Sequence, residues 1–113
     1  MSYIKNIEPG INKLEDIISI KRFQVISKAL VNNDNTDIRF FSLSKGETIR
    51  NETYPMDTLI LCLNGVLKAI EEGEEYVLHE KELKLIEMGR VSSLEAIEDT
   101  IMLQIMVKET KDE

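Results

Sequence analysis

The stretch from Gly46 to Gly65, GETIRNETYPMDTLILCLNG, constrains the fold more than any other part of the chain. It opens at a glycine, carries Glu52 and Tyr54 in a polar run, is interrupted by Pro55, and closes with the apolar segment LILCL before Asn64-Gly65. An Asn-Gly pair between such runs is a strong hairpin signal, because both central residues of a type I′ turn need positive φ. The stretch therefore predicts short antiparallel strands joined by tight turns.

The same pattern of short strand-like segments separated by turn residues continues along most of the chain. β-Formers recur from Arg22 onward, and polar or glycine-containing turns interrupt them every 8 to 12 residues or so. We expect strands in segments 22–31, 37–43, around 49, 59–63, 66–70, 75–79, 83–86, 92–97 and 100–107. About nine short strands with this spacing indicate an all-β antiparallel sandwich or barrel.

The N-terminal part has a different period. Leu14, Ile17 and Ile18 recur at helical spacing within Ile11 to Ile20, with Asn12 as the expected N-cap and Glu15 three residues later. We expect a short helix that packs as a flap on the larger body. Docking of a partner is the alternative role for its narrow apolar face.

Length and composition limit the remaining choices. With 113 residues the chain is expected to form one domain, with a lead-in at 1–21, a β-barrel at 22–107 and a frayed tail at 108–113. A net charge of −7 argues against nucleic-acid and anionic-membrane partners. Cys62 is the single cysteine, which precludes an internal disulfide. The absence of a signal-like or membrane-spanning stretch predicts a cytoplasmic protein.

The central stretch resembles the first motif of the cupin family. That motif reads glycine, five residues, His-x-His, three or four residues, glutamate, six residues, glycine. Here the spacing is Gly46, five residues, Glu52-Thr53-Tyr54, three residues, Thr58, six residues, Gly65. A subgroup of small cupins has His-Thr-x-Pro-x-Asp in this motif, and ETYPMD at 52–57 is similar except at the histidine.

The second cupin motif is less well matched. Of its positions only Gly89 agrees, whereas Lys81, Glu87, Ser92 and Ala96 replace its glycine, proline, histidine and asparagine. The resemblance covers roughly residues 20 to 107. It implies a double-stranded β-helix, that is, a cupin or jelly-roll barrel with a short N-terminal helix, and a homodimer.

The matched metal positions lack the family's usual ligands. Glu52, Tyr54, Thr58 and Ser92 supply one carboxylate and three hydroxyls, where transition-metal sites prefer imidazoles with a carboxylate. The sequence therefore predicts no metal and no cofactor. Two alternatives remain: a weak oxygen-only site for Mg²⁺ or Ca²⁺, and a metalloenzyme site of atypical composition built from Glu52, Asp57 and His79.

Single reactive residues allow two interpretations each. If strand alternation holds Glu52 inside the barrel, a partly desolvated carboxylate beside Tyr54 could serve as a general acid or base. We expect instead a solvated Glu52 at the barrel mouth, or one hydrogen-bonded to Tyr54 or Ser92. His79 is expected to be a partly exposed structural residue, and Cys62 a small buried hydrophobe on the same inward face as Thr58.

The sequence thus favours a metal-free, non-catalytic cupin with either a pocket for a small organic ligand or a packed interior. The alternatives are a metal-independent isomerase or lyase that uses Glu52 as acid or base, the atypical metalloenzyme, and an interaction module that docks through its helix. The residues expected to line a ligand pocket are Glu52, Tyr54, Thr58, Ile60, Cys62, Ser92, Met102 and Met106.

Overall fold

The computed structural model describes residues 3–109. A single turn of helix precedes nine strands. The elements are α1 (Leu14–Ile17), β1 (Val25–Asn32), β2 (Thr36–Leu43), β3 (Thr48–Thr53), β4 (Asp57–Asn64), β5 (Leu67–Glu71), β6 (Glu74–Leu78), β7 (Leu83–Ile86), β8 (Val91–Ala96) and β9 (Thr100–Val107).

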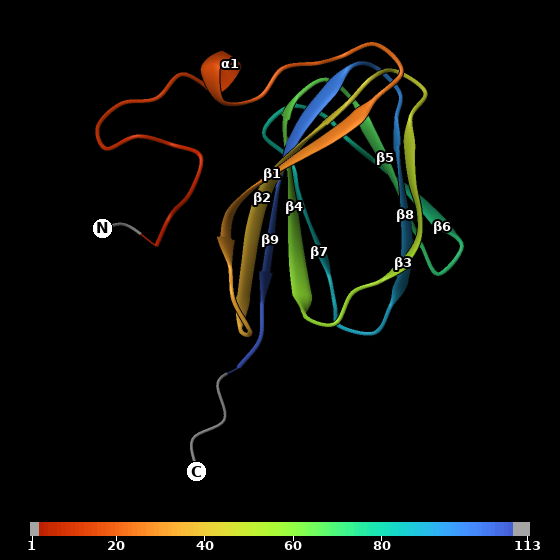
Figure 1. The fold of residues 1–113 in the computed structure, drawn as a ribbon. Coiled ribbons are helices and arrows are strands. Elements are labelled where there is room, and N and C mark those ends of the chain that lie inside the picture. Colours follow the sequence, from red (N-terminus) through yellow and green to blue (C-terminus); the bar gives the residue numbers. More distant parts are fainter. Residues whose placement is uncertain (1–2, 110–113) are drawn as a thin grey trace.

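The strands form two antiparallel sheets that face one another (Figure 1). Sheet A has five strands in the order β1-β2-β9-β4-β7, and sheet B has four in the order β3-β8-β5-β6. Neighbours in each sheet are mostly distant in sequence, so the chain crosses repeatedly between the sheets, as in a jelly roll. The predicted all-β jelly-roll fold with one short helix is confirmed.

The core lies between the sheets and follows from strand alternation. On β4, the buried side chains are those of Thr58, Ile60 and Cys62, and the residues between them point outward. Leu67 and Ala69 on β5 and Leu94 and Ala96 on β8 bury the facing side of sheet B. Both sheets therefore present one apolar face to the same interior.

The turn at Asn64-Gly65 differs from the predicted hairpin. Only Gly65 has positive φ, and β4 and β5 belong to different sheets, so this turn connects the layers. The two-residue turn with both φ values positive is Glu72-Gly73, where Glu71 pairs with Glu74 across the β5–β6 hairpin. A local Asn-Gly signal indicates a bend but does not specify which strands pair.

The N-terminal lead-in is less helical than predicted. Helix α1 covers four residues, and Asn12 does not cap it. The side chain of Asn12 instead bonds to the backbone N–H and carbonyl of Glu8, at 2.9 and 2.7 Å, and thereby closes the preceding loop. The chain is extended again at Ile18, which is buried at the end of the helix. Among residues 3–109, no helix is long and apolar enough to cross a bilayer.

The start of the predicted barrel shifts from residue 22 to Val25, whereas its predicted end at residue 107 coincides with the end of β9. Phe23 was expected in a strand but lies in the turn before β1, with φ of +62° and an exposed ring beneath the Arg22 guanidinium. Lys108 and Glu109 are exposed beyond the end of β9. The rest of the predicted frayed tail, residues 110–113, lies outside the described residues.

Candidate functional site

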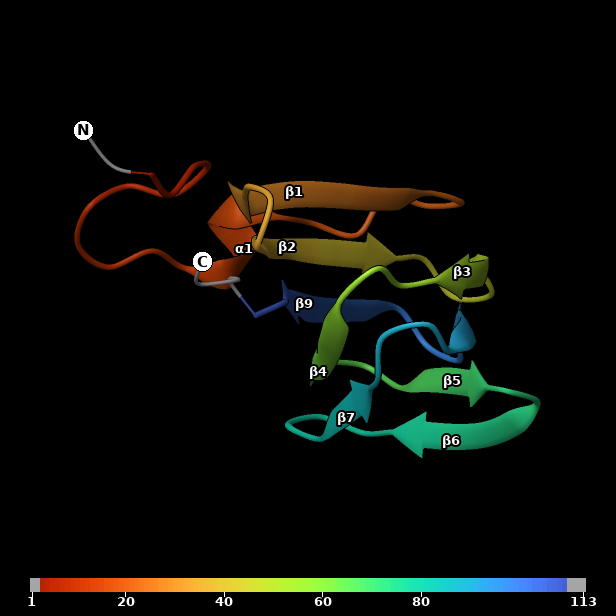
Figure 2. The ribbon, with the colours of Figure 1, turned by 90° about the horizontal axis from the view of Figure 1, so that it is seen from below.

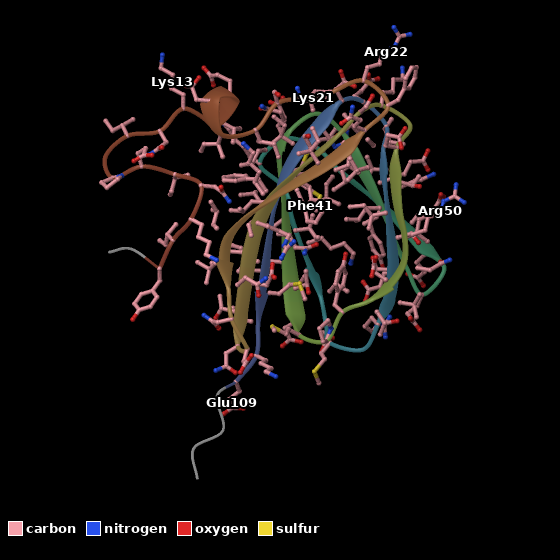
Figure 3. All side chains as sticks on the ribbon, in the orientation of Figure 1. Lys13, Lys21, Arg22, Phe41, Arg50 and Glu109 are labelled. Atoms are coloured by element: carbon pink, nitrogen blue, oxygen red, sulfur yellow. The ribbon has the colours of Figure 1, made fainter. Side chains whose placement is uncertain are left out.

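A pocket of about 300 Å³ opens between the inner face of sheet A and the end of β3. We call it the mouth pocket. Phe41 extends from β2 toward the core between the sheets and forms part of its wall (Figure 3). The lining residues are Val25, Asp37, Arg39, Phe41, Ile49, Glu52, Thr53, Tyr54, Pro55, Gln104 and Met106.

An ion pair forms one polar wall of the pocket. Asp37 and Arg39 lie two residues apart on β2 and therefore share a face. The Arg39 Nε and Nη2 donate to the two Asp37 carboxylate oxygens at 2.7 and 2.6 Å. The hydrogen bond to Asp37 is the main cause of the raised pKa of Arg39, and desolvation opposes it. The Arg39 charge is thus balanced within the protein by Asp37.

The neighbouring strand β9 in the same sheet supplies a buried amide. Gln104 on β9 pairs with Arg39, and Met106 pairs with Asp37. The Gln104 side chain is 5% exposed, and its Nε2 lies 3.4 Å from the Met106 sulfur. A thioether is a weak acceptor, so this amide retains the capacity to bond to a polar group in the pocket.

The third side of the pocket depends on a β-bulge in β3. Ile49 pairs with Leu94 and Glu52 pairs with Ser92, so β3 has two residues between these pairs where β8 has one. The extra residue in β3 is Asn51, which has φ of +53°. A bulge of this kind re-aims the following side chains. It places both Ile49 and Glu52 on the pocket side, because each lies opposite an inward-facing residue of β8.

Glu52 and Tyr54 differ in burial. The Glu52 side chain is exposed, so the carboxylate lies at the mouth and is not desolvated inside the barrel. Tyr54 is buried. Burial, and secondarily the nearby Glu52 charge, raises the pKa of Tyr54 to about 12. The phenol is therefore protonated at neutral pH and can donate a hydrogen bond but cannot accept a proton as a base.

The positions that match the family's metal ligands do not fit a transition metal. The Thr58 hydroxyl donates to the Met56 carbonyl at 3.0 Å, and Ser92 is buried with no hydrogen-bond partner for its hydroxyl among the described residues. Glu52 is exposed and Tyr54 holds its proton. One carboxylate with three neutral hydroxyls is a weak donor set for these ions.

The alternative metal site is not assembled either. The Asp57 carboxylate accepts the Met88 N–H at 2.8 Å, whereas His79 is exposed and lies 3.3 Å from Glu82 in the turn after β6. Within residues 3–109, no group of three or more His, Cys, Asp or Glu side chains could hold a metal ion.

Five of the eight predicted pocket residues are core residues and do not line the mouth pocket. They are Thr58, Ile60, Cys62, Ser92 and Met102, each 0 or 1% exposed. Burial, with smaller contributions from Glu80 and Glu82, raises the pKa of the Cys62 thiol to about 11, so it remains protonated. Glu52, Tyr54 and Met106 do line the pocket.

Four polar or charged residues of the pocket were not predicted: Asp37, Arg39, Thr53 and Gln104. Asp37, Arg39 and Phe41 alternate on one face of β2, and Gln104 lies midway between Met102 and Met106 on β9. That alternation was readable in the sequence. The pairing of β2 with β9, which brings the two sets together, was not.

The structure is similar to solved structures of small β-barrel proteins. A conserved protein of unknown function from Streptococcus pyogenes is 31% identical over 98% of both chains, with a TM-score of 0.93. A cupin superfamily protein from Desulfitobacterium hafniense is 26% identical over 96% of this chain and 100% of that one, with a TM-score of 0.88. No family model and no curated protein matches the sequence.

A third neighbour is larger. A cupin 2 conserved barrel domain protein from Leptotrichia buccalis has a TM-score of 0.87 at 23% identity, and the match covers 95% of this chain but 51% of that one. At this identity the likeness concerns the fold alone. The three matches together relate nearly the whole described chain to single barrels of this type.

Proposed function

Since the chain belongs to the cupin superfamily, we propose that it binds a small organic ligand in the mouth pocket, without a metal ion and without catalysis. The observation that carries this proposal is the lining of the pocket. Apolar side chains of Phe41, Ile49 and Met106 surround one buried amide and one pre-formed ion pair. Few polar groups in a mostly apolar recess are typical of small-molecule sites.

The charges of the lining select the class of ligand. Asp37 and Glu52 carry two negative charges, and Arg39 carries one positive charge that Asp37 already engages. The pocket therefore disfavours anions and accepts neutral or singly cationic molecules. Its volume of about 300 Å³ lies at the lower end of the usual range for ligand sites, which favours a compact molecule.

Two side chains of the pocket have no strong hydrogen-bond partner within residues 3–109 and can bond to polar groups of the ligand. The Gln104 amide faces only a thioether sulfur, and the protonated Tyr54 phenol can donate. The pocket offers no thiolate and no metal-ligand cluster, and we infer that it recognises the ligand rather than transforms it. A base at Glu52 would be exposed to water at the pocket mouth, which weakens the isomerase or lyase alternative.

Three probes of one size test the proposal. Benzylamine, benzyl alcohol and benzoate differ in charge, and amide chemical shifts of labelled protein report where each binds. We expect benzylamine and benzyl alcohol to shift the resonances of Phe41, Ile49 and Gln104 at millimolar concentration, and benzoate to have a smaller effect. No shift of these resonances up to about 10 mM of any probe, which corresponds to a binding free energy weaker than about −3 kcal/mol, would reject the pocket.

A pair of variants locates the binding. Ile49→Trp places a larger side chain in the pocket, and its matched control, Val77→Trp, adds the same group to an exposed position on β6. Binding should be lost in Ile49→Trp and kept in Val77→Trp. Equal binding by both variants would place the ligand elsewhere.

A further inference from the structure

Two buried side chains of the mouth pocket carry polar atoms without a hydrogen-bond partner. Gln104 on β9 is 5% exposed and Tyr54 is 7% exposed. Within residues 3–109, the Gln104 Oε1 and the Tyr54 hydroxyl have no partner, yet the fully enclosed side-chain atoms without one are the hydroxyls of Ser42 and Ser92. The Gln104 and Tyr54 atoms therefore reach open space, and both residues line the mouth pocket. Buried polar groups are normally hydrogen-bonded, so this pair points to a ligand that completes the bonds.

Arg39 adds a third unpaired group next to Gln104. The two residues pair across the neighbouring strands β2 and β9 on the inner face of sheet A (Figure 2). The Arg39 Nε and Nη2 are bound to Asp37, and Nη1 has no hydrogen-bond partner in the described part of the chain. Tyr54 belongs to the connection between β3 and β4, which joins sheet B to sheet A. The three unpaired groups therefore face one pocket from two of its walls.

Donors outnumber acceptors among these unpaired groups. The donors are the Tyr54 hydroxyl, the Arg39 Nη1 and one hydrogen of the Gln104 Nε2, and the acceptor is the Gln104 Oε1. The Gln104 nitrogen keeps a free hydrogen because its contact with the Met106 sulfur engages one of two. A carbonyl oxygen has two lone pairs and an amide nitrogen of a ring has one hydrogen, so a secondary amide matches this excess of donors. A carboxylate cannot donate, and the negative charges of the lining disfavour it.

We propose that the ligand of the mouth pocket is an uncharged cyclic amide, such as a lactam or the amide edge of a heterocyclic base, an inference that rests on the function proposed above. Ring closure fixes the amide cis, so its N–H and carbonyl lie on one side and can pair with the oxygen and nitrogen of Gln104. An open-chain secondary amide is trans and places these two groups on opposite sides. The body of the ring packs against the apolar side chains of Phe41, Ile49 and Met106.

Three probes that each combine a benzene ring with one carbonyl test this inference. 2-Quinolone is a cyclic amide, coumarin has an oxygen in place of its N–H, and acetanilide is an open-chain trans amide. Amide chemical shifts of labelled protein, including the side-chain NH2 of Gln104, give the three dissociation constants. We expect 2-quinolone to bind about tenfold or more tightly than the other two, because neither of them can form both hydrogen bonds with Gln104.

A matched pair of variants tests whether Gln104 causes this preference. Gln104→Met keeps the length of the side chain and removes the amide. Gln24→Met makes the same change at the other glutamine of the chain, which is exposed and outside the pocket. 2-Quinolone and coumarin should bind equally to Gln104→Met, whereas Gln24→Met should keep the wild-type preference.

Equal affinity of the wild-type chain for 2-quinolone and either other probe would overturn the inference. A preference that survives in Gln104→Met or disappears in Gln24→Met would do the same. If 2-quinolone did not bind where benzyl alcohol does, the cyclic amide would be wrong and the mouth pocket would stand as a ligand site. If neither bound, both proposals would fall. The comparison of probes on the wild-type chain does not depend on the folding of any variant.

Discussion

The backbone N–H of Asn51 donates to the Ser93 hydroxyl at 2.9 Å, where Asn51 has φ of +53°. This contact fixes the bulge that directs Ile49 and Glu52 toward the mouth pocket. Asparagine tolerates the left-handed region better than β-branched residues do.

We expect Asn51→Val to lower the free energy of unfolding by about 1–2 kcal/mol, because a β-branched side chain is strained at this φ. Ser93→Ala should cost about 0.5–1.5 kcal/mol through loss of the hydrogen bond. Asn51→Gly, which permits the same φ, serves as the control and should cost less than Asn51→Val. Urea unfolding measures all three, and equal losses for the valine and glycine variants would contradict a backbone origin.

Gly65 is required for space as well as for its φ of +94°. A Cβ at this position would collide with the Asp99 carbonyl oxygen in the β8–β9 connection and would lie 2.8 Å from the Thr100 hydroxyl at the start of β9. Gly65→Ala should therefore destabilise the protein by about 3 kcal/mol or more, from clash and backbone strain together.

The control is Gly73→Ala. Gly73 has a similar φ, +86°, but no atom lies within 4 Å of the position its Cβ would occupy. This variant should lose only about 1–2 kcal/mol, the cost of the left-handed backbone alone. If Gly65→Ala and Gly73→Ala lost the same free energy of unfolding in urea, the β4–β5 turn would be free to move away from Asp99.

The ion pairs of Glu71 connect the two sheets. The Lys84 ammonium on β7 and the Arg90 guanidinium before β8 donate to its carboxylate at 2.7 and 2.8 Å. The hydrogen bond from Lys84 is the main cause of the lowered pKa of Glu71. A lowered folded-state pKa stabilises the fold above the unfolded value near 4.5, and this contribution is lost as the pH falls through the folded value.

We expect Glu71→Gln to lower the free energy of unfolding by about 1–3 kcal/mol at pH 7, because it leaves Lys84 without its carboxylate. The variant should also show a shallower decline of stability below pH 5. Glu98→Gln is the control: its pair with Lys45 spans 3.9 Å between exposed side chains and should contribute almost nothing. Parallel pH profiles for Glu71→Gln and wild type would refute this role.

The sequence was informative wherever a signal is local. Apolar alternation and turn residues placed all nine strands, and the spacing of Gly46 and Gly65 indicated the barrel type. The sequence did not predict the register of the strands. The bulge at Asn51 depends on pairing with β8, and the partners of β2 and β4 depend on β9, which lies about 40 to 60 residues away. Long-range pairing of this kind leaves no local pattern.

The same limit explains the result for the site. Strand alternation correctly predicted that Thr58, Ile60 and Cys62 point inward. Alternation alone does not distinguish a residue of the packed core from one of the pocket wall. The wall is set by the end of β3, where the bulge directs Ile49 and Glu52 toward the inner face of sheet A. The outward position of Leu59 and Leu61 was likewise hidden, because apolar residues on both parities of β4 suggest burial on both sides of the strand.

Tyr54 provides a test of the pocket's electrostatics at high pH. Burial first, and the Glu52 carboxylate second, raise its pKa from 10.0 to about 12. A phenol is neutral below its pKa, so a raised folded-state value favours the fold fully below pH 10, and this stabilisation is lost as the pH rises toward 12. The free energy of unfolding should therefore fall by about 1–3 kcal/mol across this interval.

Tyr54→Phe has no phenol to ionise and should show a shallower decline, although the Cys62 thiol still titrates in both proteins. Urea unfolding at pH 9, 10, 11 and 12 gives the two profiles. Identical slopes would mean that the Tyr54 phenol ionises as readily in the folded chain as in the unfolded one, and that it is not enclosed by the pocket wall.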